Sequence, residues 1–104
     1  MDTKRNPLQT FVDECPEVQK AYAGLIDSLI AMKGLDGKTK QLIYIAIKII
    51  TNDLNAVRFH VPMAKKAGAT RDEVKSAVLL CLTATGLKAV SEGLDLVLES
   101  YDNC

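Results

Sequence analysis

The sequence has no net charge and no long run of apolar residues. Lysine plus arginine and aspartate plus glutamate each total 13, so no overall field draws the chain onto nucleic acid or an anionic membrane. The longest apolar stretch, residues 42–50, is interrupted by Lys48 and falls far short of the roughly 20 residues of a membrane helix. The first seven residues carry charge without the apolar run of a signal peptide. We therefore expect no nucleic-acid partner, no membrane partner and no secretion.

Cysteine is scarce, and its pattern is not that of a disulfide framework. The three cysteines, Cys15, Cys81 and Cys104, are odd in number and widely spaced, which favours a reducing compartment. A cytoplasmic location is therefore predicted. The sequence also lacks a glycine-rich phosphate loop, a GxSxG motif and a cluster of histidine and cysteine at metal-binding spacing. We expect neither a cofactor nor a metal site.

What the sequence does contain is the balance of a globular protein, with 48% apolar and 25% charged residues. Its 104 residues fit one compact domain, and no repeat or linker divides them, so a single domain over residues 1–104 is predicted. Capping residues and apolar side chains at three- and four-residue spacing predict a helical chain. The expected helices cover residues 7–14, 16–33, 37–52, 54–67, 71 to a stop at Gly86, and 87–101.

Residues 42–50 are the ambiguous segment. β-Branched residues at a spacing of two are typical of a strand, and they occur here at Ile43, Ile45, Ile47 and Ile49. However, Leu42, Ala46 and Ile50 extend the apolar surface around the whole circumference, as in a central helix. No second strand candidate exists to pair with this one. We predict a helix.

The predicted architecture is an all-α, compact bundle of about five to six helices. Pro62 falls inside the fourth helix, where it predicts a kink just after His60 or a late helix start. The helices carry broad apolar surface for so short a chain, and a small domain buries only a modest fraction of its surface alone. Self-association into a homo-oligomer is therefore expected.

His60 is the best candidate for chemistry. It is the only histidine, and its side chain is the only one here whose ordinary pKa suits proton transfer near neutral pH. Small apolar residues share its side of the helix, so the imidazole is placed to face a pocket. A structural histidine, bonded to a backbone carbonyl or to another subunit, remains an equal alternative.

Three segments resemble the carboxymuconolactone decarboxylase and alkylhydroperoxidase D-like superfamily. They are Leu35-Asp36-Gly37-Lys38-Thr39-Lys40-Gln41-Leu42-Ile43, then His60, then Ala67-Gly68-Ala69-Thr70-Arg71-Asp72-Glu73-Val74. The resemblance runs from about Leu25 to Leu87. In that superfamily a glutamate follows the leucine-aspartate-x-lysine-threonine-like start of the first segment, and a histidine lies nineteen residues after it, the offset that separates Gln41 from His60. The resemblance implies an all-α fold that commonly assembles as a trimer or hexamer.

The departures from the superfamily bear on activity. In its peroxidase members, a glutamate, a CxxC cysteine pair and a histidine form a proton relay that feeds a reactive thiolate. The equivalent residues here are Gln41, Asp53, Ala56 and His60. Glutamine accepts no proton at neutral pH, and neither aspartate nor alanine offers a thiol. Disulfide-cycling peroxidase activity is therefore not expected, and antioxidant chemistry through Cys15, Cys81 or Cys104 is the least favoured alternative.

Arg58 favours the decarboxylase branch, which resembles this chain in having a basic residue two positions before the histidine and no CxxC pair. Decarboxylating a lactone acid needs a cation for the carboxylate and an acid for the remaining carbon. However, residues two apart lie about 200° apart around a helix, so Arg58 and His60 share a pocket only through a kink or a second subunit. A surface role for Arg58 is the alternative. Tyr44, three residues after Gln41, is placed either at the same pocket or in the core.

Two main hypotheses follow. In the first, the protein acts on a small carboxylated lactone or related organic acid, with His60 as the catalytic proton donor or acceptor. Its predicted substrate-binding residues are Gln41, Tyr44, Asp53 and Arg58. In the second, the protein is a non-catalytic, oligomeric small-molecule-binding or assembly protein of the same fold.

Overall fold

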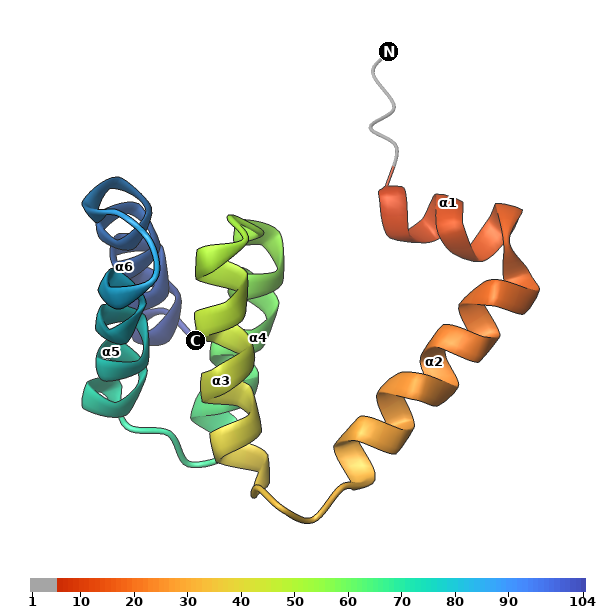
Figure 1. Ribbon diagram of the computed structural model, residues 1–104, viewed down its shortest axis with the longest axis horizontal. Coiled ribbons are helices and arrows are strands. Elements are labelled where there is room, and N and C mark those ends of the chain that lie inside the picture. The colour runs from red at the N-terminus through yellow and green to blue at the C-terminus, as the bar shows by residue number, and fades with distance from the viewer. Residues whose placement is uncertain (1–5) are drawn as a thin grey trace. The chain divides into compact units, whose positions relative to one another are not determined.

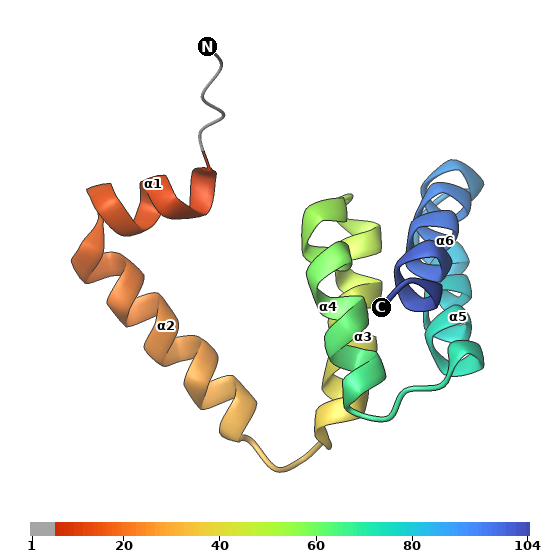
Figure 2. The ribbon, with the colours of Figure 1, turned by 180° about the vertical axis from the view of Figure 1, so that it is seen from behind.

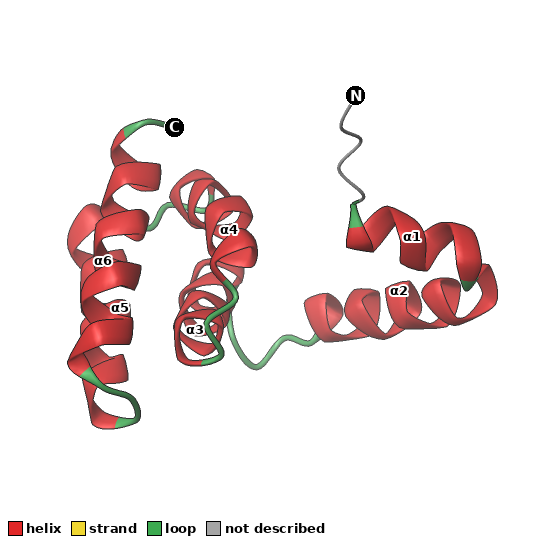
Figure 3. Ribbon diagram, turned by 90° about the horizontal axis from the view of Figure 1, so that it is seen from above, coloured by secondary structure: helices red, strands yellow, loops and turns green. Residues whose placement is uncertain are grey.

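The computed structural model describes residues 6–104, and these residues are helical, with no strand among them (Figure 1, Figure 3). The helices are α1 (Pro7–Glu14), α2 (Pro16–Ala31), α3 (Gly37–Ile50), α4 (Leu54–Lys66), α5 (Arg71–Leu80), the 3-10 helix η1 (Cys81–Thr83) and α6 (Leu87–Asp102). The predicted all-α class is confirmed, and the ambiguous segment 42–50 is a helix.

The helices begin where the capping residues predict. Side-chain oxygens of Asn6, Asp36 and Asp53 accept hydrogen bonds from backbone amides in the first turns of α1, α3 and α4. Thr70 and Glu73 form a reciprocal capping box at the start of α5. Such bonds satisfy amides that have no partner within the helix, so each start is encoded locally.

The helix ends match the predictions less closely. Helix α2 ends at Ala31 rather than near Lys33, and α5 ends at Leu80, where the chain tightens into η1. Gly86, expected to stop α5, is instead the residue that precedes α6. Helix α4 begins at Leu54 and continues through Pro62, so the predicted late start is wrong.

The chain divides into two compact units, one ending at Gly34 and the other covering Leu35–Cys104. In the first unit, α1 and α2 contact each other, and the ring of Phe11 meets that of Tyr22 edge-on at a centroid distance of 6.4 Å. No residue of α1 or α2 is buried. The prediction of one domain over residues 1–104 stays a prediction.

The second unit holds the hydrophobic core, in which α3 packs against α4, α5 and α6 (Figure 2). Gly93 of α6 allows a close approach, since a Cβ atom at this position would lie 2.5 Å from Cδ1 of Ile49 in α3. The core residues are Ile45, Ile49, Val57, Val61, Ala64, Ala69, Val74, Val78, Cys81, Val90, Leu96 and Val97.

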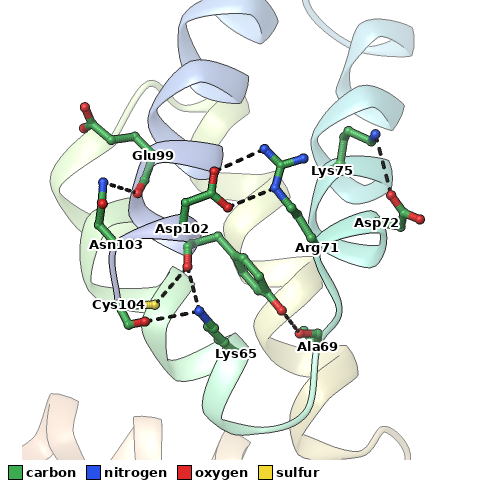
Figure 4. A network of polar contacts seen from close by, with 10 residues as sticks. Lys65, Ala69, Arg71, Asp72, Lys75, Glu99, Asp102, Asn103 and Cys104 are labelled. Carbon is green, nitrogen blue, oxygen red and sulfur yellow. Dashed lines mark hydrogen bonds and ion pairs between the residues drawn. The ribbon is translucent and has the colours of Figure 1, made fainter.

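A polar network fastens the end of α6 to α4 and α5 (Figure 4). The Tyr101 hydroxyl donates to the Ala69 carbonyl at 2.8 Å, and Lys65 Nζ donates to the Tyr101 carbonyl at 2.9 Å. Arg71 binds both carboxylate oxygens of Asp102, at 2.9 and 3.2 Å. This network holds α4, which carries His60, within the second unit.

No helix among residues 6–104 is both long and apolar enough to cross a membrane.

Candidate functional site

Polar side chains of α3 and α4 face each other in a single row. Gln41, Tyr44 and Lys48 recur at the spacing that places residues on one side of α3. Asp53 and His60, seven residues apart, share one side of α4. The short turn between the helices makes them antiparallel neighbours, so Gln41 meets His60 and Lys48 meets Asp53. We call these five residues the α3–α4 polar row.

Gln41 and His60 form a hydrogen bond, with the Gln41 Oε1 atom 2.8 Å from His60 Nδ1. An amide oxygen only accepts, so the imidazole nitrogen facing it carries the proton. In the neutral imidazole, Nε2 then keeps a free electron pair and is the atom able to accept a proton. The bond thus orients the imidazole ring, and with the amide oxygen of Gln41 facing Nδ1 it favours the tautomer protonated on Nδ1.

The ring of Tyr44 packs against that of His60, with the centroids 4.1 Å apart and the planes inclined by 42°. Lys48 Nζ also lies over the Tyr44 ring, 5.2 Å from its centroid. Tyr44 therefore joins the imidazole and the ammonium group within one cluster.

Lys48 and Asp53 form an ion pair, with Lys48 Nζ 3.5 Å from Asp53 Oδ2. The other carboxylate oxygen of Asp53 accepts the hydrogen bond of the Ala56 amide at 3.2 Å. Although partial burial opposes the change, nearby Tyr44 and Asp53 raise the pKa of Lys48. Lys48 is therefore positively charged at neutral pH.

Partial burial, followed by the positive charge of Lys48, lowers the pKa of His60 from its ordinary value of 6.5. The imidazole is therefore mostly neutral at pH 7. In this state the polar row contains one positive and one negative side chain, together with a proton acceptor on His60 Nε2.

Arg58 is placed differently from the other predicted site residues. Its side chain is exposed, and its position two residues before His60 puts it on another side of α4. Gln41, Tyr44, Asp53 and His60 lie together in the polar row, whereas Arg58 does not belong to it.

The three cysteines form no disulfide with one another. Cys81 is buried, and its thiol donates to the carbonyls of Ala46 and Ala77. Burial raises the pKa of Cys81, which keeps the thiol protonated and weakly nucleophilic. Cys15 and Cys104 are exposed.

An apolar groove of about 540 Å³ runs between α3 and the α5–η1 segment. None of the five polar-row residues lines it, so groove and row are separate features. The described residues contain no group of three or more histidine, cysteine or acidic side chains able to hold a metal ion. The groove is lined mainly by Leu42, Ile43, Ala46, Ile50, Ala77, Leu80 and Cys81.

Lys48 is the member of the row that sequence reasoning missed. It stands out in the sequence only as an interruption of an apolar segment. The available signal was its spacing, because Lys48 lies seven residues after Gln41 and four after Tyr44, on the same side of a helix. Its contact with Asp53 depends on how α3 and α4 pack.

Comparisons with known proteins agree on one family. The model of the carboxymuconolactone decarboxylase family matches residues 16–99, which is most of the chain. The crystal structure of an apo carboxymuconolactone decarboxylase family protein from Legionella pneumophila is similar, with a TM-score of 0.80 and 25% identity, covering 92% of this chain and 85% of that one. No curated protein matched in sequence. The chain therefore belongs to the carboxymuconolactone decarboxylase family.

Proposed function

We propose that the protein binds a small carboxylated lactone or related organic acid at the α3–α4 polar row and acts on it through His60. The observation that carries the proposal is the 2.8 Å contact between Gln41 Oε1 and His60 Nδ1, which leaves His60 Nε2 as a proton acceptor. Family membership supports the same chemical class.

In the proposed decarboxylation, the bond between the substrate carbon and its carboxylate breaks and carbon dioxide leaves. The electron pair left on that carbon is delocalised into the lactone carbonyl, so a substrate that is turned over carries its carboxylate on the carbon next to that carbonyl or joined to it through a ring double bond. A saturated γ-lactone with the carboxylate beside the ring oxygen serves only as a binding probe. A proton from His60 then forms the new C–H bond, and solvent reprotonates the imidazole. Because the pKa of His60 is lowered, this donor role depends on the negative charge of the bound acid to favour the imidazolium.

Two further side chains complete the proposal. Tyr44 packs against the imidazole and supplies an aromatic wall and a hydroxyl at the ligand position. Arg58, which is exposed, contacts the ligand only where a second subunit closes over the row. We therefore propose a homo-oligomer, as a trimer or hexamer, in the cytoplasm. The exposed apolar residues of α2 support self-association.

The test is turnover and binding with a panel of γ-lactone carboxylic acids. Turnover is measured as the release of carbon dioxide. Binding is measured as the shift in the thermal unfolding temperature of the protein. His60→Ala should abolish turnover and weaken binding, while Lys88→Met, at an exposed position of α6, should change neither. Absence of turnover in the wild-type protein, together with unchanged acid binding in His60→Ala, would contradict the proposal.

A second candidate function is non-catalytic binding of the same acids. Gln41 favours it, because an amide in place of a relay carboxylate orients His60 without exchanging protons with it. The lowered pKa of His60 also favours binding without proton donation. Saturable acid binding that depends on His60, with no carbon dioxide release, would select this function. Peroxide turnover that is lost on alkylating the thiols would instead select the antioxidant alternative.

A further inference from the structure

Lys48 carries a positive charge into the immediate surroundings of His60. Its Nζ atom and the imidazole ring both contact the ring of Tyr44, at centroid distances of 5.2 and 4.1 Å. The two groups are thus no farther apart than these two distances together. The side chain of Lys48 is only 26% exposed, so its charge is less screened by solvent than that of a fully exposed lysine.

Asp53 holds Lys48 in place without engaging all N–H donors of the Lys48 ammonium group. The carboxylate of Asp53 is itself fixed, because its Oδ1 atom accepts the Ala56 amide at the start of α4. The 3.5 Å ion pair is longer than the roughly 2.7–2.9 Å of a strong charge-assisted hydrogen bond. An ammonium group has three N–H donors; Asp53 and Tyr44 are its two side-chain partners, so one donor remains for another acceptor.

The charge balance of the row suits an anionic ligand. Asp53 is its one carboxylate and belongs to the cap of α4, at the end of the row away from Gln41. His60, whose pKa is lowered, adds no positive charge at neutral pH. Lys48 is therefore the cation of the row, and its ammonium group and the imidazole contact the same aromatic ring, so an acid bound at one lies near the other.

We propose that Lys48 binds the carboxylate of the acid on which the protein acts, and that Asp53 is the positioning residue for its ammonium group. The inference rests on the proposed function, in which a small organic acid binds beside His60. The further step is that Lys48 makes the contact specific to the acid. The site then selects its ligand by the negative charge of the carboxylate. The site should prefer a lactone acid to its neutral ester.

The test compares 5-oxotetrahydrofuran-2-carboxylate with its methyl ester, using NMR titration of the full-length protein. The variants are Lys48→Met, which removes the charge but keeps the length, and Lys48→Arg, which restores the charge. Lys88→Met is the matched control, because that lysine is 89% exposed and lies on α6. Arg58→Gln tests the competing cation.

We expect the wild-type protein to bind the acid more tightly than the ester, by about tenfold or more. Lys48→Met should lose this preference while still binding the ester as wild type does, which shows that the site remains folded. Lys48→Arg should recover most of the preference, and Lys88→Met should keep all of it.

Three results would overturn the assignment. If Lys48→Met keeps the preference for the acid over the ester, Lys48 is not the residue that binds the carboxylate. If only Arg58→Gln loses that preference, Arg58 binds the carboxylate instead. In both cases the proposed function survives, because the acid still binds beside His60. If the wild-type protein binds neither compound, the proposed function fails and this inference fails with it.

Discussion

Helices α2 and α6 are both 16 residues long, yet they differ completely in burial. Helix α6 buries Val90, Gly93, Leu96 and Val97 within the second unit, whereas α2 buries no residue. An isolated helix of this length is only marginally stable in water. The difference shows that caps and apolar spacing are enough to specify a helix, whether or not that helix contributes to the core of the second unit.

The core of the second unit should show the largest effect of a single substitution. Ile49 is 1% exposed and packs against Gly93, so Ile49→Ala leaves a cavity that the tight contact cannot fill. We expect a loss of about 2–5 kcal/mol in the free energy of unfolding. Urea denaturation at a fixed protein concentration measures it. A loss below about 1 kcal/mol would mean that α3 and α6 are not tightly packed.

A substitution in the first unit should change self-association and not the free energy of unfolding. Leu25 of α2 is 52% exposed, and Leu25→Asp puts a charge on the apolar side of that helix. We expect weaker self-association, with a dissociation constant raised by about tenfold or more, and unchanged folding of residues 35–104. Light scattering coupled to gel filtration measures the mass at several concentrations.

Lys20→Asp is the control for Leu25→Asp, because it adds more negative charge at an exposed polar position of the same helix. Its mass should match that of the wild-type protein. Equal masses for all three proteins would show that α2 takes no part in assembly, and the comparison between the two units would then need another explanation.

A smaller effect is expected at the network that closes the second unit. Tyr101→Phe removes the hydroxyl that donates to the Ala69 carbonyl and leaves the ring in place. The free energy of unfolding should fall by about 0.5–1.5 kcal/mol, the net contribution of one hydrogen bond. Thermal unfolding measures the change. A stability equal to wild type would mean that water replaces the hydroxyl as donor.

The sequence anticipated the helix starts far better than the helix ends. Asn6, Asp36 and Thr70 act through bonds to amides two or three residues away, so their effect is readable locally. The end of α5 was missed because Gly86 serves the following helix.

The candidate site shows the same limit. The nineteen-residue offset marked Gln41 and His60 as a pair, and the structure brings them within 2.8 Å. Lys48 was overlooked because its significance comes from α4, through Asp53. Arg58 was chosen for its resemblance to the basic residue of the decarboxylase branch, and a spacing of two from His60 carries it to another side of the helix.

The smallest expected effect is a pH dependence of stability in the second unit. The pKa of His60 is lower in the folded protein than its ordinary 6.5, so the unfolded chain takes up the proton first. The contribution of His60 to the free energy of unfolding should therefore be fully present above pH 6.5. It should fall as the pH drops from 6.5 toward the pKa of His60 in the folded protein.

His60→Gln should flatten this part of the profile, measured by urea denaturation between about pH 7.5 and 5. The groups of the polar row facing the imidazole are Gln41, Tyr44 and Lys48, with Asp53 at the far end; of these, Lys48 keeps its charge across this range. An equal slope in His60→Gln and wild type would assign the pH dependence to other groups.

The most direct test of the account is an NMR titration of the His60 imidazole, which reports its tautomer and pKa. We predict a neutral ring protonated on Nδ1 at pH 7, a pKa below 6.5, and a rise in that pKa when 5-oxotetrahydrofuran-2-carboxylate is added. A ring protonated on Nε2, or a pKa that the acid leaves unchanged, would contradict the claim that this row is built to bind an acid beside a proton acceptor.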